Sequence, residues 1–461
     1  MNFYSIIPSL SPEHKAMLRV ERPNTKFNLF YQAHPHLRYE TFYAETQSGI
    51  TIATGLLEIL GYTQKTEIDA SQKSAIKKII QKIEPFPLYD FQYDAIIDAL
   101  AYPRHMIRAA TGSGKSAIIG VLAKIFDMQN LRGLILVPNI SLVNQFGSDI
   151  DSYKLNIKYK LIGGSNKDKT FDEPLIISTW QSLYKNKSLV KNIDYLIIDE
   201  AHQAKAKEIF DIAKECQSAK HIIGLTGTIP QHPYDFLKVT SVFGMPKSYV
   251  SPKELIDKGL GTKIKIFIHN ILYKEKINFN DYSLALNSLI KNKERNAYIT
   301  NLAKSLKGNT VILTARNEHA YRLFHSFIPA QTDEKSYKDL ALQNAHNVFF
   351  INGNIPGEQR EQIRAILEKR DNAILVSNYS VLSTGVNIRN LHNLIFASPM
   401  KSYILITQSL GRLIRTHKSK NEVQVHDLCD DLGFFRAQKR ERIKNCYEPQ
   451  NYEIAEHSIQ I

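Results

Sequence analysis

The segment Ala109-Ala110-Thr111-Gly112-Ser113-Gly114-Lys115-Ser116 has the composition and spacing of a phosphate-binding loop. Glycine at two positions lets backbone N–H groups close around phosphates, and Lys115 can reach the β and γ oxygens. The Ser116 hydroxyl can hold Mg²⁺ at a helix N-terminus. The first position is alanine where glycine is usual, a small change that should not abolish binding. The sequence therefore predicts a nucleoside triphosphate site, with a structural Gly-rich turn as the alternative.

Two adjacent carboxylates, Asp199 and Glu200, follow the apolar run 195–198. In α/β proteins, ligands bind at the carboxyl ends of the sheet strands. Asp199 can hold Mg²⁺, usually through water, and Glu200 can orient and deprotonate the water that attacks a γ-phosphate. Taken alone, an acidic pair after a strand is more often a helix cap. Paired with the phosphate loop, it predicts hydrolysis of the nucleotide.

Two further elements carry hydroxyls and arginines. Residues 224–228 end a predicted strand, where the hydroxyls of Thr226 and Thr228 could bond the carboxylates and sense the γ-phosphate. Within 408–415, Arg412 and Arg415 are expected on one face of a helix. Arginines so placed can act on the developing charge of phosphoryl transfer. Surface charge is the alternative for this pair on its own.

These motifs need a scaffold, and the hydrophobic pattern predicts an α/β fold. Short runs rich in Ile, Val and Leu alternate with amphipathic stretches of helical length, which is typical of parallel strands with crossover helices. We expect strands at 105–108, 133–137, 175–178, 195–198 and 221–225, then at 310–314, 348–351, 373–377, 393–397 and 423–427. The pattern therefore predicts two α/β domains.

The expected domain boundaries follow from composition and turn signals. We expect a small accessory α/β domain at 1–84, a first large domain at 85–270, a linker at 271–292, a second large domain at 293–445 and a loosely attached tail at 446–461. A capping box predicts a short helix near 252–258, and alternation predicts a strand at 263–269. In the accessory region, 27–32 and 39–44 are strand-like.

A basic helix is predicted at 71–83. Its lysines, Lys73, Lys77, Lys78 and Lys82, fall mainly on one face. Such a face could grip duplex nucleic acid, and a solvated surface is an equal alternative.

The composition fits a soluble globular protein with a polyanionic partner. The 461 residues include 59 Lys and Arg against 45 Asp and Glu, for a net charge of +14. That balance suits nucleic acid, or simply solubility. The cysteines at 216, 429 and 446 lie far apart, without the spacing of a disulfide framework or zinc site. With no signal peptide or membrane span recognised, we expect a cytoplasmic protein.

The motifs, in their order, resemble those of the superfamily 2 helicases. The phosphate loop, 199–202, 225–228 and 408–415 resemble motifs I, II, III and VI. Pro138 and Gln145 resemble motif Ia, Thr179 the next strand-end motif, and Val311–Arg316 motif IV. Residues 376–387 match motif V, and Leu88–Ala95 the adenine-reading segment, with Tyr89 where arginine is common.

The resemblance implies two tandem RecA-like domains with ATP between them. One wall would carry Phe91 and Gln92 against the base, Thr111–Ser116 on the phosphates and the acidic pair. Gly385 would join the ATP site, while Arg412 and Arg415 would line the opposite wall, and Thr226, Thr228 and Gln408 would couple the nucleotide to movement. A single strand would lie across both domains. Its expected contacts are Pro138, Gln145, Thr179, Thr314, Ser377 and Thr384.

Within the superfamily, the sequence is similar to the UvsW-type recombination helicases of phages. The similarity lies in residues 254–259, 379–385, 390–392 and 408–420. It implies an ATP- and Mg²⁺-dependent DNA helicase that remodels forks, Holliday junctions and R-loops in recombination, repair and replication, in the host cytoplasm if phage-encoded. Its partners would be single-stranded and branched DNA, and RNA in hybrids. An RNA helicase, a restriction-type DNA translocase and a nucleotide-gated clamp remain alternatives.

Overall fold

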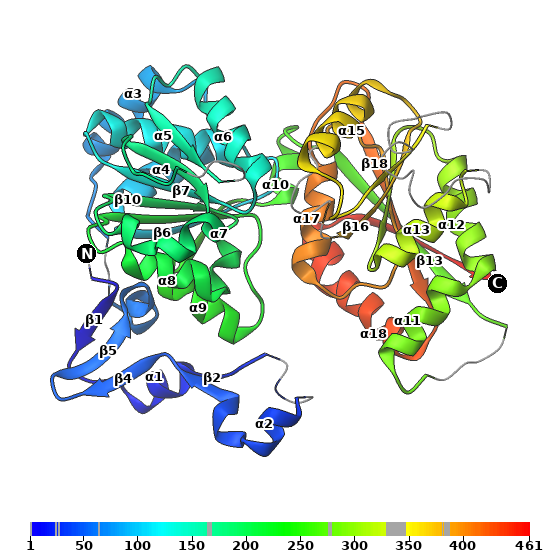
Figure 1. The fold of residues 1–461 in the computed structure, drawn as a ribbon, viewed down its shortest axis with the longest axis horizontal. Helices are drawn as coiled ribbons and strands as arrows, with labels where there is room; N and C mark the ends of the chain where they lie inside the picture. The colour runs from blue at the N-terminus through cyan, green and yellow to red at the C-terminus, as the bar shows by residue number, and fades with distance from the viewer. Residues whose placement is uncertain are drawn as a thin grey trace. The chain divides into compact units, whose positions relative to one another are not determined.

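The computed structural model describes residues 2–23, 25, 28–62, 65–163, 168–274, 279–328, 347–379, 381 and 388–461. The chain forms two compact units, Met1–Ser251 and Pro252–Ile461. Each is built on a parallel sheet, which confirms the predicted α/β class (Figure 1). Among the described residues, no helix is long and apolar enough to cross a membrane.

The first unit contains a seven-stranded parallel sheet in the order β12-β6-β11-β10-β7-β9-β8. Its central strands β7 and β10 are buried along their whole length because helices cover both faces of the sheet (Figure 1). The five strands predicted in this region are all present. The polar edge strands β8 and β12 carry weaker hydrophobic signals and were not predicted. The bounds are β6 Arg104–Ala109, β7 Gly133–Val137, β8 Tyr159–Ile162, β9 Leu175–Thr179, β10 Tyr195–Asp199, β11 His221–Thr226 and β12 Pro246–Val250.

Strand order brings together segments that are far apart in the sequence. β11 pairs with β6 on one side, with Thr226 opposite Arg108, and with β10 on the other, with Leu225 opposite Asp199. Three strands therefore end next to one another at a single edge of the sheet. The helices that cover this sheet are α4 Asp90–Ala101, α5 Lys115–Met128, α6 Ile140–Ser152, α7 Trp180–Leu183, α8 Lys207–Glu215 and α9 Pro233–Phe243.

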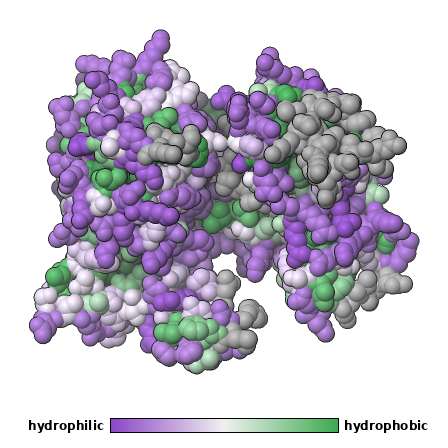
Figure 2. All heavy atoms as spheres, viewed as in Figure 1, coloured by the Kyte–Doolittle hydropathy of each residue, from purple (hydrophilic) through white to green (hydrophobic). Residues whose placement is uncertain are grey.

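The N-terminal region forms small antiparallel sheets and short helices. Strands β1, β5 and β4 make one sheet and β2 and β3 another. Strand-like character was expected at 27–32, but the described part of this segment lies in helix α2, which Asn28 caps by accepting a hydrogen bond from Phe30 N at 2.9 Å. A hydrophobic patch over α2 is visible in Figure 2. The bounds are β1 Tyr4–Ile7, α1 Pro12–Met17, β2 Arg19–Glu21, α2 Leu29–Ala33, β3 Tyr39–Thr41, β4 Tyr43–Thr46, β5 Gly49–Ala53 and η3 Thr54–Leu60.

This region is part of the first unit and not the separate accessory domain that was expected. Phe3, Ile52 and Leu56 belong to the same hydrophobic core as Leu134 and Phe243. A Cβ atom at Gly55 would collide with backbone oxygens of α9. Local patterns predicted the short elements, but they could not show that their apolar faces pack on the large sheet.

The predicted basic helix is α3, Ala70–Ile83, and it packs against α4 and α5. Its lysines do not share one environment. Lys77 pairs with Asp90 at 3.3 Å and lies over the ring of Tyr93, whereas Lys73, Lys78 and Lys82 are exposed. One lysine of the expected face is therefore used within the protein.

The second unit has a seven-stranded parallel sheet in the order β15-β16-β14-β17-β18-β13-β19. The five strands predicted in this region are present. Helices α12 and α13 pack on one face, and α15 and α17 on the other. The strands are β13 Lys263–Leu272, β14 Thr310–Thr314, β15 Val348–Ile351, β16 Ile374–Asn378, β17 Asn393–Phe396, β18 Glu422–Asp430 and β19 Glu453–Gln460. The helices are α10 Pro252–Asp257, α11 Tyr282–Lys291, α12 Lys293–Ser305, α13 Asn317–His325, α15 Gly357–Lys369, α17 Tyr403–Leu413 and α18 Gly433–Arg442.

Three expected boundaries differ from the structure. β13, expected at the end of the first domain, lies in the second sheet between β18 and β19. The expected tail contains β19, which pairs with β13 over eight residues. The expected linker contains α11, whose Leu286 and Leu289 pack with Phe435. β13 was predicted as a strand, but the sheet it joins, the pairing of β19 and the packing of α11 all depend on partners distant along the chain.

Gly55 provides a test of how the N-terminal region is attached. Gly55→Ala should lower the free energy of unfolding of the first unit by about 1–3 kcal/mol, because the methyl group would displace η3 from α9. Urea denaturation measures this, with Gly353→Ala as control, since a Cβ there meets nothing within 4 Å. Equal midpoints for the two variants would contradict the shared core.

Candidate active site

The phosphate loop connects β6 to α5 at the carboxyl edge of the first sheet, as predicted. Gly112 and Gly114 have φ of 88° and 79°, in the left-handed region that favours glycine. A Cβ atom at Gly114 would also collide with the Gln92 amide. Both glycines therefore allow the turn of the loop. Gly114 also allows Gln92 to pack closely against the loop.

Lys115 is the first residue of α5, and its ammonium lies over the loop. Its Nζ donates to the carbonyl oxygens of Ala109 at 3.2 Å and Ala110 at 3.4 Å. Burial raises the pKa of Asp199, and the positive charge of Lys115 reduces this rise. Lys115 is thus placed between the loop and the acidic pair, which suits neutralisation of phosphate charge.

The adenine-reading segment is joined to the loop by Gln92. Its Nε2 donates to Ser113 O at 2.9 Å, and its Oε1 accepts from Tyr89 N at 2.8 Å. Phe91 is buried, and its ring stacks at 16° against that of Tyr89, which is 48% exposed. Phe91 was expected to stack on the base, but the exposed ring is that of Tyr89. The sequence signal for an exposed ring was the tyrosine at position 89, where arginine is common in the resembling helicases.

The acidic pair lies at the end of β10. Asp199 is buried, and its Oδ1 has no hydrogen-bond partner in the described part of the chain. Burial, with the charge of Glu200 adding to it, raises the pKa of Asp199 to about 7. Glu200 has φ of 53°, an unfavourable value for a residue with a side chain. A buried carboxylate oxygen without a hydrogen-bond partner among the described residues, next to a residue with strained backbone, is typical of a functional site.

A hydrogen-bonded chain joins the acidic pair to the end of β11. His202 Nδ1 lies 3.3 Å from Glu200 Oε2 and 3.0 Å from Thr226 Oγ1, which in turn donates to Thr228 O at 2.9 Å. The two threonine hydroxyls were expected to bond the carboxylates. Instead Thr226 bonds His202, and the buried Thr228 hydroxyl has no partner among the described residues.

A close approach between Gly227 and Thr111 joins the segment after β11 to the phosphate loop. Gly227 packs on the phosphate loop, because a Cβ there would lie 3.2 Å from Thr111 Oγ1. No role was predicted for His202, although its position two residues after Glu200 was the available signal. The phosphate loop, the acidic pair and the end of β11 are thus connected by contacts between their residues.

Among the nucleic-acid residues predicted in the first unit, Thr179 ends β9 and caps α7. Its Oγ1 accepts from Ser182 N at 3.3 Å and lies 2.9 Å from Ser182 Oγ. Pro138 directly follows β7, and Gln145 is exposed on α6. These residues follow neighbouring strands, but the Thr179 hydroxyl already has protein partners.

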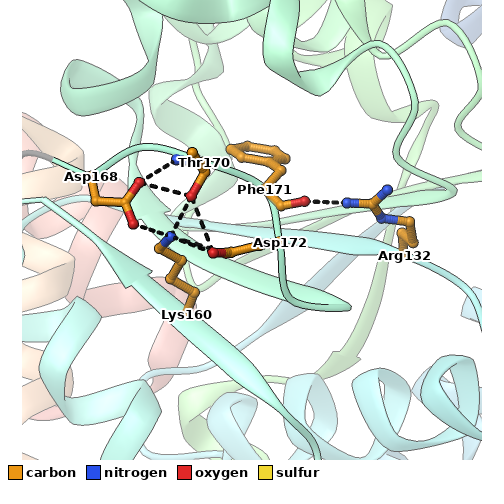
Figure 3. A network of polar contacts seen from close by, with 6 residues as sticks. All are labelled: Arg132, Lys160, Asp168, Thr170, Phe171 and Asp172. Atoms are coloured by element: carbon orange, nitrogen blue, oxygen red, sulfur yellow. Dashed lines mark hydrogen bonds and ion pairs between the residues drawn. The ribbon is translucent and has the colours of Figure 1, made fainter.

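A polar loop beside these residues was missed by the sequence analysis. Lys160 Nζ on β8 contacts Asp168 Oδ2 at 2.6 Å, Thr170 Oγ1 at 2.6 Å and Asp172 Oδ1 at 2.9 Å (Figure 3). Hydrogen bonding to Lys160 holds the pKa of both carboxyls below the usual range. Lys169 Nζ reaches Ser182 O at 2.8 Å, which ties this loop to α7.

The predicted nucleic-acid residues of the second unit are largely buried. Thr314 Oγ1 donates to Arg316 O at 3.0 Å, and Ser377 Oγ donates to Ile351 O at 2.8 Å. Thr314 is the last residue of β14 and Ser377 the penultimate residue of β16, and both hydroxyls already donate to backbone carbonyls of the protein. Thr384 and Gly385 lie outside the described residues.

The arginine pair lies at the end of α17. Arg412 is in the last turn of this helix, and Arg415 lies beyond its final residue, Leu413. Gln408 is buried within the helix. The expected placement of both arginines on one helix face is therefore wrong for Arg415, because the helix ends first.

Two family models match the chain. A model described as the res subunit of type III restriction enzymes matches residues 65–231, and the helicase conserved C-terminal domain matches 285–417. The first match covers the loop and acidic pair, and the second contains both arginines.

Several known proteins are similar to this chain. The ATP-dependent DNA helicase uvsW of Enterobacteria phage T4 is 28% identical over 392 residues, covering 82% of this chain and 74% of that protein. A fragment of a putative HsdR subunit of a type I restriction enzyme from Vibrio vulnificus has a TM-score of 0.59 at 19% identity, over 85% of this chain and 72% of that one. Dbp5 of S. cerevisiae, bound to RNA and ADP BeF3, has a TM-score of 0.58 at 13% identity, over 83% and 93%. These two structures establish the fold.

Asp199 should make the stability of the ligand-free protein depend on pH. Because its pKa is raised to about 7 by burial, the folded state holds the proton more tightly than the unfolded state, so stability falls as pH rises from about 4 to 7. Asp199→Asn should therefore raise Tm relative to wild type at pH 8 and change it little at pH 4. The exposed Asp94→Asn is the control, and a pH-independent difference would contradict the assignment.

Proposed function

We propose that this chain, which belongs to the superfamily 2 helicases, couples ATP hydrolysis to unwinding or branch migration of forked DNA, Holliday junctions and R-loops. The matched regions and the ordered motifs make it an ATP-dependent helicase, and they confirm the superfamily, the likeness to UvsW-type helicases and the enzyme class expected from the sequence. The supporting observation is the convergence of phosphate loop, acidic pair and β11 at one sheet edge.

In the proposed mechanism, the backbone N–H groups of the loop and Lys115 hold the triphosphate of ATP. The base lies near the Gln92 segment, where the exposed Tyr89 ring offers a stacking surface. Gln92 keeps this segment fixed to the loop through Ser113. Binding at this end of the site is therefore organised before the nucleotide arrives.

The site fits Mg²⁺, since Asp199 supplies a buried carboxylate oxygen that has no hydrogen-bond partner among the described residues, and Ser116 supplies a hydroxyl in the first turn of α5. We propose that these two residues hold the ion. When bound, Mg²⁺ supplies charge neutralisation for the phosphates. Because the pKa of Asp199 is about 7 without it, binding of the ion should release a proton.

Glu200 is the proposed general base for the attacking water. Its carboxylate lies next to His202, which the Thr226 hydroxyl holds in place. The chain from Glu200 to β11 gives a route by which a change at the γ-phosphate could move the segment after β11. Thr226, Thr228 and Gln408 are the proposed coupling residues.

Arg412 and Arg415 are the proposed arginine fingers, acting on the transferred phosphoryl group when the nucleotide is bound. A single strand is proposed to follow the carboxyl ends of the strands, near Pro138, Gln145 and Thr179 in the first unit and Thr314, Ser377 and Thr384 in the second. Contacts there would be to the backbone and would carry no sequence information. Substrate choice must then come from elsewhere in the chain, for example the N-terminal region.

The function is tested by measuring ATPase and strand displacement on forked DNA, Holliday junctions, R-loops, linear duplex DNA and duplex RNA. We expect displacement on the branched DNA substrates. Lys115→Ala should remove ATP turnover and leave nucleic-acid binding largely intact, because the lysine neutralises phosphate charge only.

Other outcomes would contradict the proposal. ATP turnover with no displacement on any substrate would indicate a nucleotide-gated clamp. Turnover on linear duplex without displacement would indicate a restriction-type translocase, and displacement confined to duplex RNA would indicate an RNA helicase.

Arg415→Ala should lower kcat far more than it raises the Kd for ATP, because the finger acts on the transition state. Related arginine fingers contribute on the order of 10³ to 10⁵ in kcat. Arg415→Lys should rescue little, since an ammonium lacks the planar fork. The measurement is single-turnover hydrolysis with saturating forked DNA, and the exposed Arg440→Ala is the control. A normal hydrolysis rate with loss of displacement would make Arg415 a coupling residue.

A further inference from the structure

A buried lysine lies at the end of the helix that carries the arginine pair. Lys420 is only 7% exposed, and its Nζ donates to the carbonyl oxygens of Leu413 at 2.9 Å and Leu391 at 3.2 Å. Leu413 is the last residue of α17, so its carbonyl has no partner within the helix. A cation at this point is favoured by the helix dipole.

The next two carbonyl groups along the chain are also held. Thr262 N donates to Ile414 O at 2.7 Å, and Thr262 Oγ1 donates to Arg415 O at 3.3 Å. The three consecutive carbonyls of 413–415 are therefore fixed by Lys420 and by the residue that precedes β13. This is the stretch of main chain that sets the relative positions of the Arg412 and Arg415 side chains.

A short turn carries Lys420 and is itself anchored. Ser419 Oγ donates to Asn390 Oδ1 at 2.8 Å, and Lys420 N donates to His417 O at 3.2 Å. Lys420 is thus held from the loop before β17 and reaches back to α17. Its position depends on segments that flank the arginine pair on both sides.

We propose that Lys420 is a positioning residue for hydrolysis, which holds the end of α17 so that Arg412 and Arg415 can reach the phosphoryl group. The inference rests on the proposed role of these arginines. Lys420 itself touches no substrate. Its contribution is the two hydrogen bonds from its charged ammonium to the backbone.

The charge on Lys420 depends on pH within an accessible range. Burial, and then the charge of Arg415, lowers its pKa to about 8, while Glu368 on α15 raises it. Glu368 accepts from Arg389 N and Asn390 N, and His392 and His417 contact Ser419 in the adjoining turn. Loss of the proton above pH 8 would weaken the hold on Leu413 O.

Activity and stability should then respond to pH in opposite ways. The pKa of Lys420 is lower in the folded protein than in the unfolded chain. Between about pH 8 and 10 the folded state therefore binds fewer protons than the unfolded state, and Lys420 makes the free energy of unfolding increase as pH rises. Hydrolysis should nevertheless fall over the same window. A purely structural role would not produce a loss of kcat alongside unchanged or higher Tm.

The test compares Lys420→Met with Lys420→Arg and with the exposed Lys418→Met as control. Lys420→Met should lower single-turnover hydrolysis about ten- to a hundredfold, with little change in the KM for ATP, since a small displacement of a catalytic group costs this much. Lys420→Arg should keep most of the activity at pH 7.5 and retain it to higher pH than wild type, because a guanidinium stays charged. Lys418→Met should behave as wild type.

The outcomes separate this inference from the proposed function. If Arg415→Ala is impaired and Lys420→Met is normal, the positioning role is wrong and the finger stands. If Arg415→Ala hydrolyses normally, the finger itself is wrong. If Lys420→Met fails to fold, the pH profiles of wild type and Lys420→Arg decide: identical alkaline limbs overturn the inference, and an extended limb in Lys420→Arg supports it.

Discussion

The pairing of β11 between β6 and β10 is the constraint on which the rest of the nucleotide site depends. This ladder fixes the register, so that Thr226 lies opposite Arg108 and Leu225 opposite Asp199. The segment after β11 is thereby brought against both the phosphate loop and the acidic pair. A slip of one residue would turn the Thr226 side chain to the other face of the sheet and break its contact with His202.

Three buried carboxylates, Asp430, Asp427 and Asp199, differ in their hydrogen-bond partners. In the second unit, Asp430 pairs with Arg295 at 2.7 and 2.8 Å, and Asp427 pairs with Arg442 at 2.8 Å through both oxygens. Both carboxylates are fully matched by bidentate partners. Asp199 is buried, and its Oδ1 has no hydrogen-bond partner in the part of the chain that the structure describes, which carries an energetic cost. This contrast within one chain points to ligand binding at Asp199.

The two units use the ends of secondary structure in related ways. In the first, α5 begins directly after Gly114 of the phosphate loop, and in the second, backbone carbonyls at the end of α17 are held by Lys420 and Thr262. Helix ends have unsatisfied backbone groups, which makes them both binding sites and attachment points. The strand-end threonines add to this pattern, because Thr179 and Thr314 bond local neighbours and shape the turns that follow.

The sequence by itself determined the α/β class and all ten strands predicted for the two large sheets, because the hydrophobic period is a local signal. Its glycine-rich and acidic motifs also predicted a nucleotide site, and the residues of that site stay a prediction. It did not show that β13 and β19 belong to the second sheet, that residues 1–60 share the core of the first, or that α17 ends before Arg415. The contacts of His202 with Glu200 and Thr226, and of Lys420 with the end of α17, were also hidden. Only the tertiary structure decided these points. Most of them depend on hydrogen bonds or packing between residues far apart along the chain, and the last turn of α17 depends on where that helix ends. A local sequence pattern records neither.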